Sequence, residues 1–151
     1  MENTKTVTFN RKAYHDYHIL DTVEAGIVLK GTEIKSIREA KVNIRDAYAK
    51  VEGDEMWLYN AHISKYQAGS HFDHDPDRRR KLLLHRSQID ELAQDTIKKG
   101  LTIVPLKLYI KKGMAKVELG LARGKRTFDK RETITRRDAE REIERSLKHN
   151  R

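Results

Sequence analysis

Apolar and polar residues alternate along most of the chain up to about residue 125, which predicts a protein built mainly from β-strands. The clearest long strand covers residues 17–29, where the apolar side chains share one parity and the pattern is interrupted at Asp21. Such a strand buries one face and leaves the other in water. Gly26 lies within it and indicates a bulge or a sharp bend.

Two β-hairpins are predicted further along the chain. The first joins residues 47–51 to residues 56–63 through a four-residue loop, Glu52-Gly53-Asp54-Glu55. The second gives the strongest local signal, with a turn at Lys112-Gly113 between two strands of strictly alternating apolar residues. We expect each set to lie on one side of its strand: Val104, Leu106, Leu108 and Ile110 on the first, and Val117, Leu119 and Leu121 on the second.

Two helices are expected between the strands. The longer begins at a capping box formed by Ser87 and Asp90 and ends at Lys98-Lys99-Gly100, while the shorter covers Thr32–Glu39. Five or six short strands and two or three helices fit a small closed β-barrel of the oligonucleotide-binding (OB) type. A split α+β sheet is the alternative fold.

The charge balance points to a polyanionic partner. The chain has 151 residues and a formal net charge of +9, since 32 Lys and Arg outnumber 23 Asp and Glu. It contains no cysteine, which excludes disulfides, thiolate metal sites and cysteine nucleophiles. No apolar run approaches the roughly 20 residues of a membrane span, and the first ten residues lack the apolar core of a signal peptide. We therefore expect a soluble protein of the cytoplasm.

Residues 129–151 differ from the rest of the chain. Their only large apolar residues are Ile134, Ile143 and Leu147, too few to offset the entropy cost of ordering the segment. Ala139, Ile143 and Leu147 nevertheless fall four residues apart, as on one face of a helix. We expect residues 1–128 to form the barrel and residues 129–151 a basic tail that is disordered when free and helical when bound to a partner.

A histidine-bearing acidic stretch, residues 71–77, precedes the basic run Arg78–Lys81. Its His and Asp side chains are suitable metal ligands, but their spacing matches no known metal-binding motif. A mobile loop whose cations contact phosphates is favoured over a metal site and over a plain solvated loop. We expect no metal.

Enzyme active sites and RNA-stacking sites each require particular residues in the sequence. No nucleophile motif, phosphate-binding glycine loop or dinucleotide fingerprint is present, which argues against an enzyme.

RNA can stack on aromatic rings, but alternation is expected to bury one of each strand pair such as Trp57 and Tyr59. Phe128 is the exception, because cations surround it and no apolar periodicity explains its burial. A stacking role and a local packing role both remain open for Phe128.

Six segments in order resemble the SmpB family of SsrA-binding proteins. They are Asn10–Tyr17, Glu24–Gly26, Gly31–Arg38, His74–Leu84, Val104–Tyr109 and Gly124–Arg131. Tyr14 stands where the family usually has Arg, which would remove one RNA contact. Ala40 stands where Gly is common, which puts a turn with positive φ in doubt because Ala tolerates that conformation poorly.

The resemblance implies an OB barrel of six strands and a partner, the tRNA-like domain of transfer-messenger RNA (tmRNA), bound by one face. His15, Glu24, Leu83 and Lys116 match the family's RNA-binding positions. Strand parity independently predicts that Lys116 faces outward. Leu83 is either a core residue or a contact to a base or sugar, and Glu24 would accept hydrogen bonds from base donors or ribose hydroxyls.

The resemblance further implies that the complex rescues ribosomes stalled on messages without a stop codon, with the tail in the decoding centre and the empty message channel. The residues assigned to this role are Phe128, Asp129, Lys130, Arg131, Arg136, Arg137, Ile143 and Leu147. Phe128 would stack on a ribosomal base. No catalysis, cofactor or small-molecule substrate is implied.

Two rival functions follow from the same residues. One is a general binder of single-stranded nucleic acid, or a ribosomal protein of barrel fold. The other is a metal-dependent nuclease that uses Asp73, Asp75 and Asp77.

Overall fold

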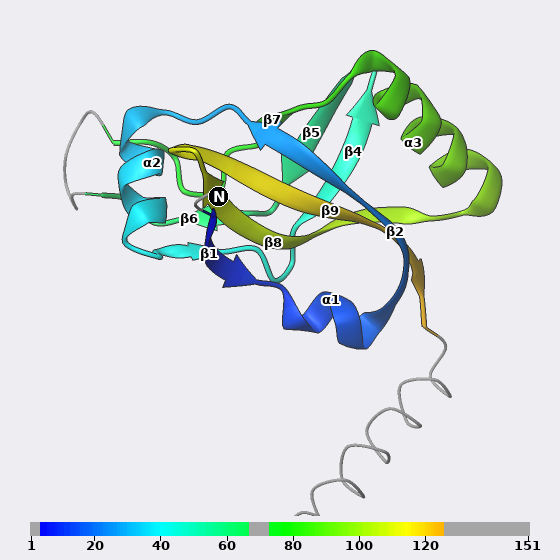
Figure 1. Ribbon diagram of the computed structural model, residues 1–151, viewed down its shortest axis with the longest axis horizontal. Coiled ribbons are helices and arrows are strands. Elements are labelled where there is room, and N and C mark those ends of the chain that lie inside the picture. The colour runs from blue at the N-terminus through cyan, green and yellow to red at the C-terminus, as the bar shows by residue number, and fades with distance from the viewer. Residues whose placement is uncertain (1–3, 67–72, 126–151) are drawn as a thin grey trace, which may run out of the picture.

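Antiparallel strands make up most of the computed structural model, which describes residues 4–66 and 73–125 (Figure 1). Within these residues there are nine strands and three helices. The strands are β1 (Thr4–Phe9), β2 (Tyr17–Ile27), β3 (Val42–Asn43), β4 (Tyr48–Glu52), β5 (Glu55–Tyr59), β6 (His62–Ile63), β7 (Arg80–Leu83), β8 (Thr102–Lys111) and β9 (Met114–Gly124). The helices are α1 (Arg11–Asp16), α2 (Gly31–Arg38) and α3 (Arg86–Lys99).

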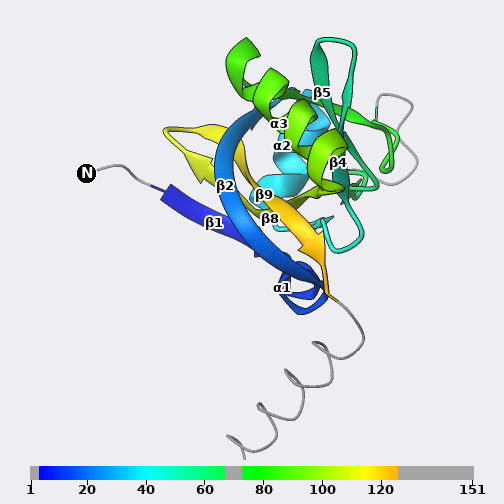
Figure 2. The same ribbon diagram turned by 90° about the vertical axis from the view of Figure 1, so that its right-hand side faces the viewer.

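Six of the strands form a closed ring. They pair in the order β8-β4-β5-β7-β2-β9, and β9 pairs back with β8. β1 extends the sheet from β8, and β3 pairs with β6 in a separate sheet. In Figure 1, α2 lies at the left of the ring, α3 at the upper right and α1 below it, and Figure 2 shows the same arrangement from the side. The mainly β fold class and the closed arrangement of about six strands are therefore confirmed.

The main hydrophobic core lies within the ring and beneath two of the helices. Ile37 of α2 and Ile89 of α3 join side chains from the ring strands in this core. Val117, Leu119 and Leu121 of β9 all belong to it, as the alternation predicted. Its most deeply buried members include Met56, Leu58, Leu82, Ile103, Leu108, Val117 and Leu119.

Bulges in β2 and β8 give the molecule a second, smaller core. The pairing register shifts at Leu20 in β2 and at Leu106 in β8. A bulge inserts one extra residue and moves the side chains beyond it to the other face of the strand. The second cluster consists of Ala13 of α1 with Val104, Leu106 and Ala122, and Tyr17 and Ile19 pack against it.

The bulges explain two errors of the sequence-based prediction. The apolar residues of β8 do not share one side: Val104 and Leu106 pack in the second cluster, while Leu108 and Ile110 contact the main core. Of the bulge or sharp bend predicted at Gly26, the bulge is wrong, because Gly26 pairs in register with its neighbours and the bulge lies six residues earlier, at Leu20.

The β4–β5 hairpin has a tighter turn than predicted. Glu52 pairs directly with Glu55, so the loop is only Gly53-Asp54, and the φ of +61° at Gly53 is the left-handed conformation that glycine adopts most easily. β5 ends at Tyr59, and Asn60 has a φ of 61°. The predicted strand 56–63 is therefore divided into β5 and β6.

The two predicted helices are present, with one change of cap. α3 begins two residues earlier than expected, and the Gln88 side chain accepts a hydrogen bond from the backbone N–H of His85 in place of the predicted Ser87 and Asp90 box. Gly100 ends α3 in the left-handed conformation, with a φ of 63°. This C-terminal stop is as predicted.

A left-handed residue follows α2 even though it is not glycine. Ala40 has a φ of 59°. The turn that alanine put in doubt is therefore formed, at a cost of about 1 kcal/mol relative to glycine. Its backbone N–H donates to the carbonyl of Ile37 at 2.9 Å, and the next N–H donates to the carbonyl of Ser36 at 2.9 Å.

The sequence pattern did not indicate β1 and α1. The buried side chain of Asn10 fixes α1 in place: its Oδ1 accepts from the N–H of Ala13 at 3.1 Å. Its Nδ2 donates to the carbonyls of Ile44 at 3.1 Å and Pro105 at 2.9 Å. One amide thus ties the helix start to β8 and to the segment before β4.

Candidate nucleic-acid interface

Three of the four predicted RNA-binding residues line one hollow on the outer surface. Its volume is about 410 Å³, and it lies where β2, β7 and β9 meet the start of α3. The lining residues are Glu24, Gly26, Leu83, Leu84, His85, Gln88 and Lys116. Gly26 pairs with Leu83 on one side and with Lys116 on the other, so the sheet itself brings these two side chains together.

Leu83 is a surface residue and not part of the core. Its side chain is 52% exposed, whereas the neighbouring Leu82 is 1% exposed. Gly26 permits its position, because a Cβ at residue 26 would lie only 3.2 Å from the Cβ of Leu83. Of the two roles that the sequence left open for Leu83, core packing is therefore excluded.

The hollow carries one positive and one negative side chain. Lys116 is half-buried and has no carboxylate partner among residues 4–66 and 73–125. As predicted from strand parity, it lies on the outer face, opposite to the buried Val117 and Leu119. The Glu24 carboxylate lies 3.4 Å from the ammonium of Lys111. The hollow therefore offers a cation for phosphate and an acceptor for hydrogen-bond donors.

His15 lies apart from this hollow. It belongs to the last turn of α1, at the opposite end of β2, where its Nδ1 lies 2.9 Å from the Asp16 carboxylate. It lines a different, basic hollow together with residues such as Arg11, Lys12 and Arg45. The structure thus groups Glu24, Leu83 and Lys116 but does not bring His15 to them.

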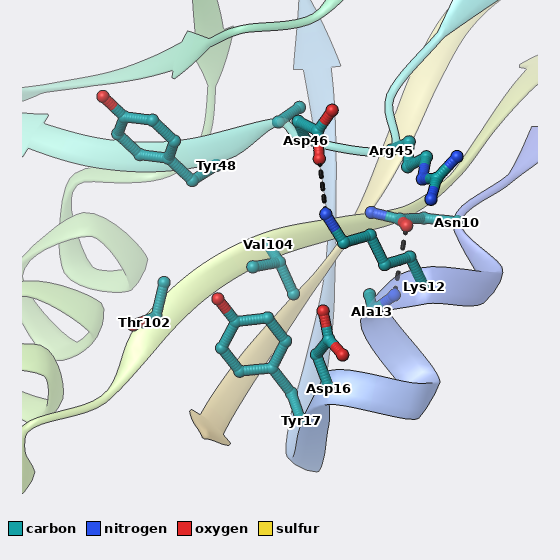
Figure 3. Close-up of a pocket in the computed structure, with 11 residues that line it drawn as sticks. Asn10, Lys12, Ala13, Asp16, Tyr17, Arg45, Asp46, Tyr48, Thr102 and Val104 are labelled. Atoms are coloured by element: carbon teal, nitrogen blue, oxygen red, sulfur yellow. Dashed lines mark hydrogen bonds and ion pairs between the residues drawn. The ribbon is translucent and has the colours of Figure 1, made fainter. Parts of the chain in front are cut away.

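Another hollow beside α1 has a volume of about 340 Å³ (Figure 3). The rings of Tyr17 and Tyr48 lie on its walls, and Lys12 pairs with Asp46 at 2.7 Å across its upper side. Sequence reasoning did not single out Tyr48, Arg45 or Asp46, since each becomes part of a site only through its position next to α1.

The chain leaves the ring beside the hollow that Tyr17 and Tyr48 line. The backbone N–H of Lys125 donates to the carbonyl of Asp16 at 2.8 Å, and its ammonium donates to the carbonyl of Tyr14 at 3.2 Å. The residues assigned to the tail, from Phe128 to Leu147, lie outside the described residues. Their point of departure at α1 is nevertheless fixed by these bonds.

The basic run Arg78–Lys81 does not form the phosphate-facing surface that its sequence indicates. Arg80 is fully buried, and its Nη2 lies 2.6 Å from the Glu33 carboxylate. Arg78 also pairs with Glu33. Burial alone would raise the pKa of Glu33, but hydrogen bonds from Arg78, from the Lys30 backbone and from Arg80 outweigh it and lower the pKa.

The other two cations of the run cover the β4–β5 hairpin. The guanidinium of Arg79 lies 4.1 Å from the centroid of the Trp57 ring and pairs with Glu52 at 2.8 Å. Lys81 pairs with Glu55 at 2.8 Å. Trp57 is half-buried on the outer face, because the inward positions of β5 belong to Met56 and Leu58.

Within the part of the chain that the structure describes, no three His, Asp or Glu side chains of the acidic stretch are grouped so that they could hold a metal ion. His74 is buried, with its Nε2 2.8 Å from the Ile63 carbonyl and its Nδ1 2.8 Å from the Thr32 hydroxyl. Asp73 is buried beside it, whereas Asp77 pairs with His62 at the surface. Residues 67–72 lie outside the described residues.

No helix of the described chain is long and apolar enough to cross a bilayer.

The chain is similar to known proteins in both sequence and fold. The sequence profile of a family described as "SmpB protein" matches residues 7–149. An SsrA-binding protein of Carboxydothermus hydrogenoformans is 59% identical over 144 residues, which cover 95% of this chain and 97% of that protein. An SsrA-binding protein of Ligilactobacillus salivarius is 61% identical over 140 residues, covering 93% and 90%. A solved chain from "tmRNA-SmpB: a journey to the center of the bacterial ribosome" superposes with a TM-score of 0.68 at 50% identity, covering 84% of this chain and 93% of that one.

Proposed function

Because the chain belongs to the SmpB protein family, we propose that it binds the tRNA-like domain of tmRNA and delivers it to stalled ribosomes for trans-translation. The observation that carries this proposal is the outer hollow that joins Glu24, Leu83 and Lys116. The protein acts as an adaptor in the cytoplasm and does no chemistry itself, since the ribosome forms the peptide bonds.

Each residue of the hollow offers RNA a different contact. Lys116 meets a phosphate, which makes the affinity depend on salt. The exposed Leu83 packs on a base or a ribose, and Glu24 accepts hydrogen bonds from amino groups or 2′-hydroxyls. His15, at the far end of β2, contacts a separate part of the bound RNA.

The other end of the ring faces the ribosome. The chain leaves β9 at α1, where Lys125 is tied to the carbonyls of Tyr14 and Asp16. Residues 129–151 are unstructured in the free protein and fold as a helix in the decoding centre and the message channel. The residues that make these contacts are Phe128, Asp129, Lys130, Arg131, Arg136, Arg137, Ile143 and Leu147, with Phe128 stacked on a ribosomal base.

A binding experiment tests the first part of the proposal. The protein should bind an RNA of the tRNA-like domain far more tightly than an unstructured oligonucleotide of equal length, with an affinity that falls steeply as salt rises. Lys116→Met should weaken this binding about tenfold, because it removes a phosphate contact from a concave site. Lys98→Met, at an exposed lysine of α3 away from the hollow, is the matched control and should change the affinity less than twofold. Equal affinity for both RNAs would favour the general single-strand binder instead.

A truncation tests the second part. A chain that ends at Asp129 should keep its thermal stability and its affinity for the tRNA-like RNA but lose ribosome rescue. A clear drop in the unfolding temperature would contradict a tail that is unstructured when free.

A further inference from the structure

Two side chains of β8, Lys111 and Tyr109, act on the Glu24 carboxylate from across β9. The ammonium of Lys111 lies 3.4 Å from Oε2 of Glu24. Tyr109 is 6% exposed, and its pKa is raised by burial first, and then by the negative charge of Glu24 and a hydrogen bond to it. β8 and β2 are not neighbours at this point, since β9 lies between them, so both side chains reach across β9. Neither Tyr109 nor Lys111 lines the hollow itself.

Without a nearby cation, the position of Glu24 would be electrostatically unfavourable. It pairs in register with Glu118 of β9, and like charges directly opposite each other destabilise a sheet. Each carboxylate has its own lysine: Lys111 for Glu24, and Lys107 for Glu118 at 3.3 Å. Tyr109 lies between the two pairs, with the Lys107 ammonium 5.2 Å from its ring centroid.

The buried hydroxyl of Tyr109 remains a donor over the whole physiological range. Burial, followed by the negative charge of Glu24 and the hydrogen bond to it, raises the pKa of Tyr109 to about 12. A protonated phenol has one hydrogen to give, and a carboxylate can only accept. The direction of this hydrogen bond is therefore fixed.

We propose that Tyr109 and Lys111 are positioning residues that hold the Glu24 carboxylate at the edge of the hollow, ready to accept hydrogen bonds from the bound RNA. The inference rests on the proposed function, and the RNA groups concerned are base amino groups and ribose 2′-hydroxyls. A glutamate that is already held loses less side-chain freedom when it binds. The lysine also offsets the repulsion between Glu24 and the surrounding phosphates.

A double-mutant cycle on RNA affinity tests the role of Tyr109. Tyr109→Phe keeps the ring and removes only the hydroxyl, and it should weaken binding of the tRNA-like RNA about fivefold, as expected for one hydrogen bond. Glu24→Gln should weaken binding by a similar or larger factor. The double variant should bind within about twofold of Glu24→Gln alone, because the phenol acts only through Glu24. A loss equal to the product of the two single losses, or no loss for Tyr109→Phe, would overturn the proposal.

A pair of lysines on β8 provides the matched control for Lys111. Lys107 and Lys111 are both half-buried, and Lys107 pairs with Glu118 as Lys111 pairs with Glu24, so Lys107→Met and Lys111→Met remove the same charge from the same strand. Lys111→Met should weaken binding more than Lys107→Met in the natural sequence, and equally in a Glu24→Gln background. Equal losses in the natural sequence would refute the role of Lys111.

The same measurements separate this inference from the proposed function. If the natural protein shows no preference for the tRNA-like RNA, the proposed function fails. If the preference is present but the losses at residues 24 and 109 multiply, only the positioning role fails. Unfolding midpoints of all variants, measured in the same buffer, establish that each is folded at the temperature of the binding assay.

Discussion

Strand β7 places an arginine inside the protein and a leucine on its surface. Arg80 is fully buried, while Leu83, three residues later, is 52% exposed. This is the reverse of the usual preference, in which arginine is mostly exposed and leucine is mostly buried. The difference separates two regions of the molecule: an interior cluster around Glu33 that holds the fold together, and the outer hollow around Leu83 that is open to a partner.

The two regions satisfy their charges in different ways. In the interior cluster, Glu33 accepts hydrogen bonds from Arg78, Arg80 and the Lys30 backbone, and Arg80 also donates to the carbonyl of Ala61 at 2.6 Å. In the outer hollow, Lys116 has no carboxylate partner among the described residues. Arg80 makes its hydrogen bonds inside the protein and therefore has no donor free for RNA. Lys116 is open at the hollow and can pair with a phosphate.

The largest expected effect is on the interior cluster. Glu33→Gln should lower the free energy of unfolding by about 3–5 kcal/mol, because it leaves the buried guanidinium of Arg80 without a counter-charge. Unfolding in urea, followed by circular dichroism, measures this loss. The affinity of the remaining folded protein for RNA should not change, since Glu33 lies outside the hollow.

Glu39→Gln is the matched control for this measurement. Glu39 follows the same helix and pairs with Lys41 at 3.1 Å, but both side chains are about half exposed. Its loss should stay within about 0.5 kcal/mol, as is usual for a surface pair. If the two substitutions cost the same, the interior cluster does not have the structural role that separates it from the hollow.

Leu82 and Leu83 are adjacent but differ in exposure, so their alanine variants test the core and the hollow separately. Leu82→Ala should destabilise the protein by about 2–4 kcal/mol and leave the intrinsic RNA affinity unchanged, because Leu82 is 1% exposed and packs in the core. Leu83→Ala should have the opposite profile, with little change in stability and an affinity loss of about fivefold. Titration of the tRNA-like RNA and thermal unfolding of the same samples give both quantities. A stable Leu83→Ala variant with full affinity would remove Leu83 from the interface.

The sequence predicted which strands and helices form better than it predicted which face of each strand is buried. Alternation correctly placed Val117 and Lys116 on opposite sides of β9, and Gly100 correctly ended α3. It failed at Leu20 and Leu106, because one extra residue in a strand reverses the parity of everything beyond it and leaves no mark in composition. Bulges of this kind are set by tertiary packing, here by the second cluster beneath α1.

The same limit applies to the candidate site. The run Arg78–Lys81 looks like a solvated cationic surface because its partner Glu33 lies 45 residues earlier than Arg78, and long-range pairing is not visible in a local pattern. Glu24, Leu83 and Lys116 of the hollow were identified by family resemblance, and strand parity supported only the outward position of Lys116. Their convergence depends on Gly26, which pairs with both β7 and β9 and leaves room for Leu83.

The smallest expected effect is a pH dependence at the edge of the hollow. The unfolded chain releases the Tyr109 proton near its ordinary pKa of 10.0, whereas the folded protein keeps it up to about 12. Between these values the unfolded state binds fewer protons than the folded state, so stability falls as pH rises. The contribution of Tyr109, roughly 2–3 kcal/mol, is fully present below pH 10 and lost by about pH 12.

Comparison with Tyr109→Phe isolates this contribution from the other lysines and tyrosines that titrate in alkali. Phenylalanine cannot ionise, so the stability of the natural protein relative to Tyr109→Phe should fall between pH 10 and 12, as the buried Tyr109 near Glu24 loses its proton. Urea unfolding at intervals of half a pH unit measures it. A difference that stays constant over this range would mean that the pKa of Tyr109 is not raised in the folded protein.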